Sequence, residues 1–142
     1  MIILDANILI YAKIPQFPQH ATIAKWVEAE YNKTEPVGVP WISIWAFMRI
    51  TTNQRIWPKS VPISEIFSAA RDWTTNPNTR LLHPGPRHLQ LAEELVLASG
   101  MTGAKITDAV LAAITIEHDG TLASTDSDFQ RFPGLRYINP LA

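Results

Sequence analysis

Aspartates that directly follow predicted strands are the residues of this sequence best placed to do chemistry. Asp5 follows a short apolar run at the start of the chain, and Asp126 and Asp128 follow a similar run near its end. Asp108 lies early in an apolar helical segment that leads into the later strand. Ligands bind to open parallel sheets beyond the carboxyl ends of the strands. We therefore expect all four side chains at one edge of a sheet.

Carboxylates that converge in this way favour a divalent cation, because like charges held close together need a compensating charge. Mg²⁺ takes oxygen ligands, keeps several waters and leaves positions for a phosphate. The chain has no cysteine, and its four histidines lie outside these motifs, so a zinc site is not expected. Taken singly, each aspartate also fits a purely structural role at a helix N-terminus.

Length and composition narrow the class of protein. The 142 residues correspond to one domain, expected over residues 1–142. The net charge of −1 excludes a strongly basic protein that coats nucleic acid by charge alone. No run approaches the roughly 18 apolar residues of a membrane span. The start of the chain also lacks the basic region of a signal peptide, so we expect a cytoplasmic protein with no membrane partner.

Short apolar strands that alternate with helices predict an α/β fold whose mainly parallel sheet is covered on both faces. The strands are expected at residues 2–4, 37–39, 79–82, 121–124 and 136–138. The helices are expected at residues 8–12, 20–31, 41–52, 64–73, 87–99 and 104–118. Ser64 is a candidate cap for the fourth helix, and Gly100 is expected to end the fifth.

Six stretches spread over nearly the whole chain share a family pattern. They are ILDAN (residues 3–7), FMRITTN (47–53), TDAVLAA (107–113), STDSDF (124–129), RFPGL (131–135) and NPL (139–141). Through them the chain resembles the PIN-domain ribonucleases, specifically the VapC-type toxins of bacterial type II toxin–antitoxin systems. The resemblance implies a three-layer α/β/α fold and endonucleolytic cleavage of RNA with Mg²⁺ or Mn²⁺. It also implies inhibition by a small cognate antitoxin protein, and a homodimer.

The resemblance also implies roles for individual residues. Three positions match the family's catalytic, metal-binding acids, namely Asp5, Asp108 and Asp126. Asp128 matches an acid that often sits beside them as a further metal ligand. Asn7 and Ser124 match polar positions that support the acids. One position departs from the pattern, because Ala46 stands where many PIN nucleases carry a glutamate, and the number of metal ions therefore stays open between one and two.

Basic and aromatic side chains are the candidates for contacts with RNA. Arg49, Arg55 and Arg131 are predicted to bind phosphate groups, the alternative being solvated helix ends. Trp57, in a predicted loop, is the one tryptophan that is a candidate for stacking on a base. The remaining four tryptophans follow apolar helical patterns and are expected to pack in the core or at a dimer interface: Trp26, Trp41, Trp45 and Trp73.

Two functions from other classes remain as alternatives. The first is a PIN-fold module that binds RNA or protein without cleaving, which the alanine at position 46 favours. The second is a phosphatase of the haloacid-dehalogenase type, in which an aspartate after the first strand is the nucleophile. Such enzymes place a second acid two residues on, where this chain has Asn7, which cannot donate a proton as a general acid.

Overall fold

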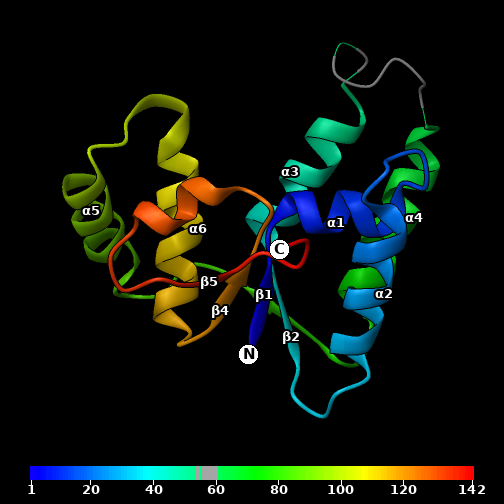
Figure 1. The fold of residues 1–142 in the computed structure, drawn as a ribbon, viewed down its shortest axis with the longest axis horizontal. Coiled ribbons are helices and arrows are strands. Elements are labelled where there is room, and N and C mark those ends of the chain that lie inside the picture. Colours follow the sequence, from blue (N-terminus) through cyan, green and yellow to red (C-terminus); the bar gives the residue numbers. More distant parts are fainter. Residues whose placement is uncertain (54, 56–60) are drawn as a thin grey trace.

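A five-stranded parallel sheet forms the centre of the computed structural model, which describes residues 1–53, 55 and 61–142 (Figure 1). The strands are β1 (Ile2–Leu4), β2 (Val37–Pro40), β3 (Thr79–Leu82), β4 (Thr121–Ala123) and β5 (Arg136–Ile138). Their order is β3-β2-β1-β4-β5, and every adjacent pair is parallel. The chain thus builds outward from β1 on one side and then crosses to β4 on the other. The junction of β1 and β4 is the switch point at which such sheets bind ligands.

Helices cover both faces of the sheet, which gives three layers (Figure 1). One face carries α1 (Ala6–Lys13), α2 (His20–Tyr31), α3 (Trp41–Thr51) and α4 (Ile63–Thr75). The other carries α5 (His88–Ser99) and α6 (Ile106–Glu117). Two short 3₁₀ helices, η1 (Gly103–Lys105) and η2 (Ser127–Arg131), adjoin α6 and β4. The predicted α/β/α architecture with a parallel sheet is confirmed.

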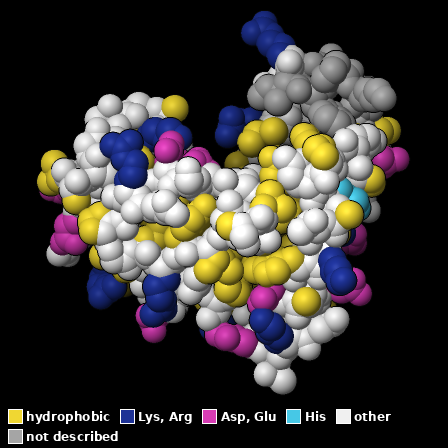
Figure 2. All heavy atoms as spheres, viewed as in Figure 1, with side chains coloured by type: hydrophobic (Ala, Val, Ile, Leu, Met, Phe, Trp, Pro, Cys, Tyr) yellow, Lys and Arg dark blue, Asp and Glu magenta, His cyan; other side chains and the backbone are white. Residues whose placement is uncertain are grey.

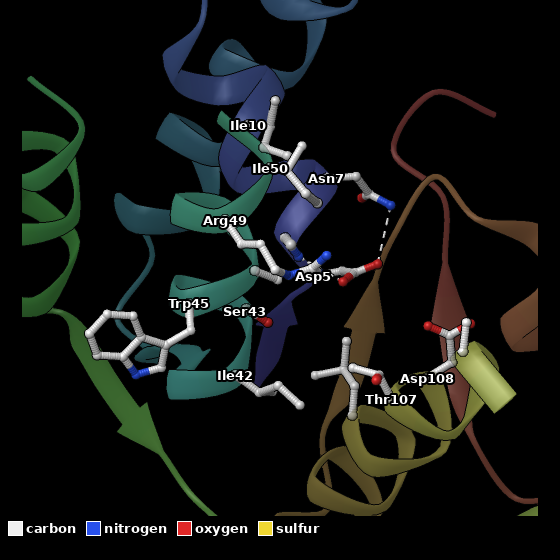
Figure 3. A pocket seen from close by; sticks show the side chains of 14 residues that line it. Asp5, Asn7, Ile10, Ile42, Ser43, Trp45, Arg49, Ile50, Thr107 and Asp108 are labelled. Atoms are coloured by element: carbon white, nitrogen blue, oxygen red, sulfur yellow. Dashed lines mark hydrogen bonds between the residues drawn. The ribbon is translucent and has the colours of Figure 1, made fainter. Parts of the chain in front are cut away.

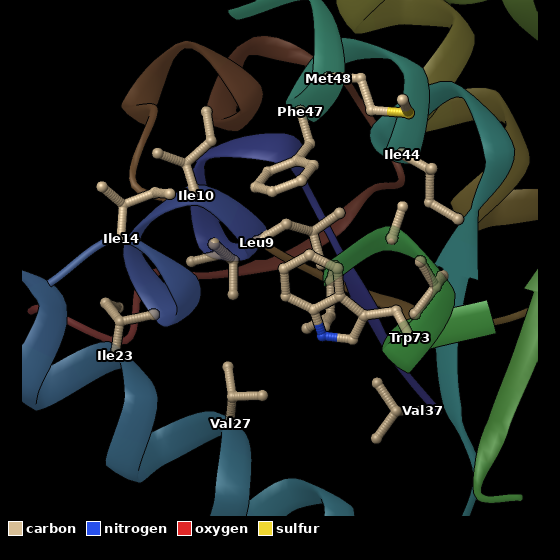
Figure 4. Close-up of a cluster of buried hydrophobic side chains, with 14 of the residues drawn as sticks. Leu9, Ile10, Ile14, Ile23, Val27, Val37, Ile44, Phe47, Met48 and Trp73 are labelled. Carbon is tan, nitrogen blue, oxygen red and sulfur yellow. The ribbon is translucent and has the colours of Figure 1, made fainter. Parts of the chain in front are cut away.

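Aromatic and branched side chains fill the layer between the sheet and α1–α4 (Figure 4). Phe47 and Trp73 meet edge to face, with ring centroids 5.2 Å apart and planes at 90°. Trp73 is 4% exposed, and Trp26 is partly buried against the same cluster. The expected packing in the core is therefore confirmed for Trp73, and Trp26 packs against the same cluster with part of its side chain.

Small side chains let α6 lie close to the opposite face of the sheet. Ala109, Ala112 and Ala113 are fully buried beside Ile3 and Leu122 of the central strands. Because α6 is held by apolar contacts along this face, the position of its first turn relative to the strand ends is well defined. No helix in the described part of the chain has the length and apolar character needed to cross a membrane.

Several helix boundaries differ from the sequence-based expectation. The first helix begins at Ala6 rather than residue 8, because the Asp5 carboxylate caps it by accepting the Ala6 N–H at 2.7 Å. Ser64 does not cap α4, which starts one residue earlier behind Pro62. Gly100 does end α5, in the left-handed conformation with φ 69°.

A further difference lies at the start of α6. A helix was expected from residue 104, whereas residues 103–105 form a separate 3₁₀ turn and α6 begins at Ile106. Gly103, the first residue of η1, has φ 63°, a backbone conformation that glycine adopts without strain. As a result Lys105 stands at the N-terminal boundary of α6.

Candidate active site

Asp5 is held where β1 passes into α1, next to the end of β4. Its Oδ2 accepts hydrogen bonds from the Ser124 hydroxyl at 2.6 Å and from the Asn7 amide at 3.1 Å. Its Oδ1 accepts the N–H of Ala6 at 2.7 Å. Both oxygens are therefore engaged, and the orientation of the carboxylate is set by groups from two strand ends.

Asn7 and Ser124 connect the two strand ends to each other as well as to Asp5. The Asn7 amide N–H also donates to the Ser124 hydroxyl oxygen at 3.0 Å, and its Oδ1 accepts the N–H of Thr125 at 3.2 Å. The Ser124 hydroxyl oxygen further accepts the N–H of Asp126 at 3.1 Å. The two residues thus contact Asp5 directly and link it to the segment that carries Asp126.

A second group of carboxylates gathers around the ammonium of Lys105. Its Nζ lies 2.8 Å from Asp128 Oδ2, 3.5 Å from Asp108 Oδ2 and 3.7 Å from Asp126 Oδ2. Asp108 is in the first turn of α6, while Asp126 caps η2 by accepting the N–H of Asp128 at 2.9 Å. The three acids converge as predicted, but around a lysine that the sequence reasoning did not single out. The signal available was the spacing of Lys105 and Asp108, three apart at a helix start.

Burial and mutual repulsion shift the pKa values of these acids. Burial raises the pKa of Asp5 to about 6, and the charges of Asp108 and Asp126 add to the rise, while the hydrogen bonds from Ser124 and Ala6 oppose it. Burial also raises the pKa of Asp108, against the effect of Lys105. The hydrogen bond from Lys105 lowers the pKa of Asp128, and the same bond raises the pKa of Lys105. Lys105 is therefore charged at any physiological pH.

A groove of about 570 Å³ opens between α3 and α6, with Asp5 at its centre (Figure 3). Figure 2 shows the surface notched between the side of the molecule that carries α5 and α6 and the side that carries α3. Asp108 and Thr107 line the groove from α6, and Trp45, Ala46 and Arg49 line it from α3. Acidic, basic and aromatic groups thus face one shared space.

The arginines predicted to bind phosphate are placed differently from one another. Arg49 projects into the groove from α3 on the side of Asp5 (Figure 3). Arg131 instead donates to the backbone carbonyl of Ser99 at 3.3 Å, beside the end of α5. Arg55 is exposed, its backbone N–H bonded to the side chain of Asn53 at 3.0 Å, and it does not line the groove. Of the three, Arg49 has the position expected of a substrate contact.

Trp45 does not pack in the core, so that of the two expectations for this tryptophan only a dimer interface stays a prediction. Its side chain is 59% exposed and lines the groove, and Trp41, one turn earlier, is 38% exposed. Both lie on α3, whose buried face is instead formed by Ile44, Phe47 and Met48. Trp57, the candidate for base stacking, lies outside the described residues.

The acids fit a divalent cation in chemical type, since all of their donor atoms are carboxylate oxygens. The position of the Lys105 ammonium shows in addition that a positive charge is stabilised among three of them. Within residues 1–53, 55 and 61–142, however, no three acidic or histidine side chains stand in an arrangement that would already hold a metal ion. The carboxylates that could bind a metal ion are present, and three of them are arranged around the ammonium of Lys105.

The fold and the site together define a known class of protein: the chain belongs to the PIN domain family, whose model matches residues 2–135. Within it the chain falls among the VapC proteins. It is 38% identical over 141 residues to Ribonuclease VapC33 and to Ribonuclease VapC31 of Mycobacterium tuberculosis, covering 99% of each chain. Its fold is similar to that of VapBC2 from Rickettsia felis bound to a DNA fragment from their promoter, with TM-score 0.74, 18% identity and 98% of both chains covered. The family resemblance is confirmed; a single domain over all of residues 1–142 stays a prediction.

Proposed function

We propose that this protein is a metal-dependent endoribonuclease that hydrolyses RNA phosphodiester bonds and acts as the toxin of a toxin–antitoxin pair in the cytoplasm. The observation that carries the proposal is the convergence of the acids. Asp5 and Asp108 line one groove, and Asp126 lies beside Asp108 across the ammonium of Lys105. Two relatives named ribonuclease, which match this chain over nearly their whole length, support the cleavage of RNA.

In this proposal Asp5, Asp108 and Asp126 hold Mg²⁺, or Mn²⁺ in its place, and Asp128 is a further ligand. When bound, the ion supplies a Lewis acid for the scissile phosphate and lowers the pKa of a coordinated water. The chain's own part is to keep the acids in place. Ser124 and Asn7 do this for Asp5, because their side chains donate to the carboxylate oxygen Oδ2.

The wall of the groove formed by α3 offers groups for the RNA chain. Arg49 supplies a positive charge for a phosphate next to the scissile one. Trp45 presents an exposed aromatic face one turn earlier, on which a base can stack without sequence preference. Since Arg55 and Arg131 lie outside the lining of the groove, any contribution from them would be to RNA further along the chain.

The proposed partners follow from the family. A cognate antitoxin would block the groove, whose apolar lining by Ile42, Ile50 and Leu111 suits a protein segment as well as RNA. We also propose a homodimer.

A non-catalytic PIN-fold module is the second candidate. Two observations favour it: Ala46 presents no carboxylate to the groove that it lines, and no described group of three acids is preassembled for a metal ion. The phosphatase alternative has no such support. The chain belongs to the PIN domain family, and Asn7 at the position of the general acid donates its amide hydrogens to Asp5 and Ser124.

The deciding experiment is cleavage of total RNA by the purified, antitoxin-free chain in Mg²⁺, in Mn²⁺ and in excess chelator. We expect cleavage with either ion, none in chelator, and none with Asp108→Asn. Asp119→Asn is the matched control, because Asp119 is an exposed acid away from the groove whose positive φ of 52° asparagine tolerates. Cleavage in chelator, or by the Asp108 variant, would contradict the proposed chemistry. RNA binding without cleavage would favour the non-catalytic module.

A further inference from the structure

Lys105 puts a positive charge in the middle of the acids to which the proposed function gives the metal ion. Its Nζ is within 4 Å of three carboxylates, from Asp108, Asp126 and Asp128. All three are among the proposed metal ligands, Asp128 as the further one. The lysine comes from the 3₁₀ turn directly before α6, so one short segment supplies both the ammonium and, through Asp108, one of its partners.

We propose that Lys105 is a tethered cation that competes with the divalent metal ion for Asp108 and Asp126. In this view the site is stable without metal because the lysine neutralises part of its negative charge. Metal then binds only as the Lys105 side chain withdraws. The inference rests on the proposed function, since it concerns the same acids.

Distance and charge make the two cations alternatives. Mg²⁺ requires its oxygen ligands at about 2.0–2.1 Å. The Oδ2 atoms of Asp108 and Asp126 stand 3.5 Å and 3.7 Å from an ammonium instead, and they are not arranged for a metal ion together with Asp5. If these carboxylates moved to bind a metal ion, the ammonium of Lys105 would lie close to the positive charge of that ion, and the two would repel each other. Each cation therefore lowers the affinity of the acids for the other.

The side chain of Lys105 is also able to leave. It is 43% exposed, and the ion pairs that it makes are with groups that are 24%, 37% and 43% exposed. Exposed ion pairs are individually weak, and a lysine stem is flexible. Withdrawal into solvent would thus break contacts of modest strength and would leave the apolar packing of α6 untouched.

A purely structural role for Lys105 predicts the opposite change in metal affinity when the lysine is removed. If the lysine serves only to hold three repelling acids together, removing it will spread them and weaken metal binding. If it competes, removing it will strengthen metal binding. The sign of the change in metal affinity therefore separates the two roles.

The test is the dissociation constant of Mn²⁺, measured without RNA by electron paramagnetic resonance or calorimetry on the full chain. We expect Lys105→Met to bind Mn²⁺ about threefold to tenfold more tightly than the unmodified protein, a range set by the loss of a few weak ion pairs. Lys105→Arg, which keeps the charge, should stay near the unmodified value. Lys33→Met is the matched control, because Lys33 pairs with Glu30 at 2.8 Å at the end of α2, away from the groove.

The outcomes separate this inference from the proposed function. Equal or weaker Mn²⁺ binding by Lys105→Met, with binding that Asp108→Asn abolishes, would overturn the competition and leave the metal site standing. No Mn²⁺ binding by either the unmodified chain or Lys105→Met would overturn both. Thermal unfolding checks that each variant is folded, and Lys105→Gln provides a second neutral replacement should Lys105→Met not fold.

Discussion

The hydroxyl of Ser124 donates a 2.6 Å hydrogen bond to Oδ2 of Asp5 across 119 positions of sequence. The contact exists because β1 and β4 are parallel neighbours, with Leu4 paired to Ala123, so that the residues following each strand emerge side by side. The same hydroxyl oxygen accepts the backbone N–H of Asp126 at 3.1 Å. One side chain thus connects two of the acids that we assign to the metal.

Replacing Ser124 with alanine should destabilise the protein and disturb the site. Asp5 loses its shortest hydrogen bond, and the partners of a fully buried hydroxyl are left without it. We expect the free energy of unfolding at neutral pH to fall by about 1–3 kcal/mol. Chemical denaturation measures the change, and cleavage of RNA should fall with it.

Ser43→Ala is the control for that variant. Ser43 is 2% exposed and lines the same groove, yet its hydroxyl has no hydrogen-bond partner in the described part of the protein. Its replacement should leave stability unchanged or slightly higher. An equal loss from both serine variants would show that the Ser124 hydrogen bond has no special importance.

The stability of the metal-free protein should decrease as the pH rises from about 4 to about 6. The pKa of Asp5 is raised from 3.8 to about 6 in the folded protein, so over this interval the folded state binds a proton that the unfolded state has lost. The stabilisation is complete below the unfolded pKa and is lost as the pH passes the folded one. A shift of this size corresponds to roughly 3 kcal/mol at most.

Denaturation in chelator at several pH values tests this dependence. Asp5→Asn removes the titrating group, so its stability should vary less with pH over the same interval than that of the unmodified protein. Parallel curves for the two proteins would rule out Asp5 as the source.

Trp45→Ala should weaken RNA binding with little effect on stability. The side chain is 59% exposed on the wall of the groove, and stacking of a base on an aromatic ring is worth about 1–3 kcal/mol. In an Asp108→Asn background, which prevents cleavage, we expect the dissociation constant for RNA to rise at least fivefold. Fluorescence anisotropy measures it. Trp41→Ala, on the same helix but outside the lining of the groove, should leave it unchanged; equal losses would contradict a specific role for Trp45.

Ala46→Glu should strengthen metal binding. Position 46 lines the groove together with Asp5 and Asp108, so a glutamate there would add a carboxylate to the site that Ala46 now leaves without one. We expect tighter binding of Mn²⁺, or a second bound ion, in calorimetric titrations. Ala46→Gln separates the charge from the size of the new side chain and should give neither effect. Unchanged stoichiometry and affinity in the glutamate variant would show that position 46 does not reach the metal.

The order of strands and helices was predictable because it depends on local patterns. Apolar runs bounded by proline, glycine and acids marked all five strands, with the observed ends for β1, β3 and β5 and with one end displaced by one residue for β2 and β4. The edge at which Asp5, Asp108 and Asp126 gather followed from the rule for parallel sheets alone. Errors fell at helix starts, where side-chain caps and a single turn conformation decide the boundary, as at Asp5 before α1 and at Gly103, the first residue of η1.

What the sequence determined by itself is therefore the alternation of strands and helices, and the acids that follow the strands. Only the tertiary structure decided which other side chains join those acids. Lys105 lies among three carboxylates, Trp45 faces the groove instead of the core, and Arg131 turns to the carbonyl of Ser99. These outcomes depend on how α3, α6 and η2 pack around the sheet. A pattern of neighbours along the chain carries periodicity, but it does not carry the direction in which a flexible or amphipathic side chain finds its partner.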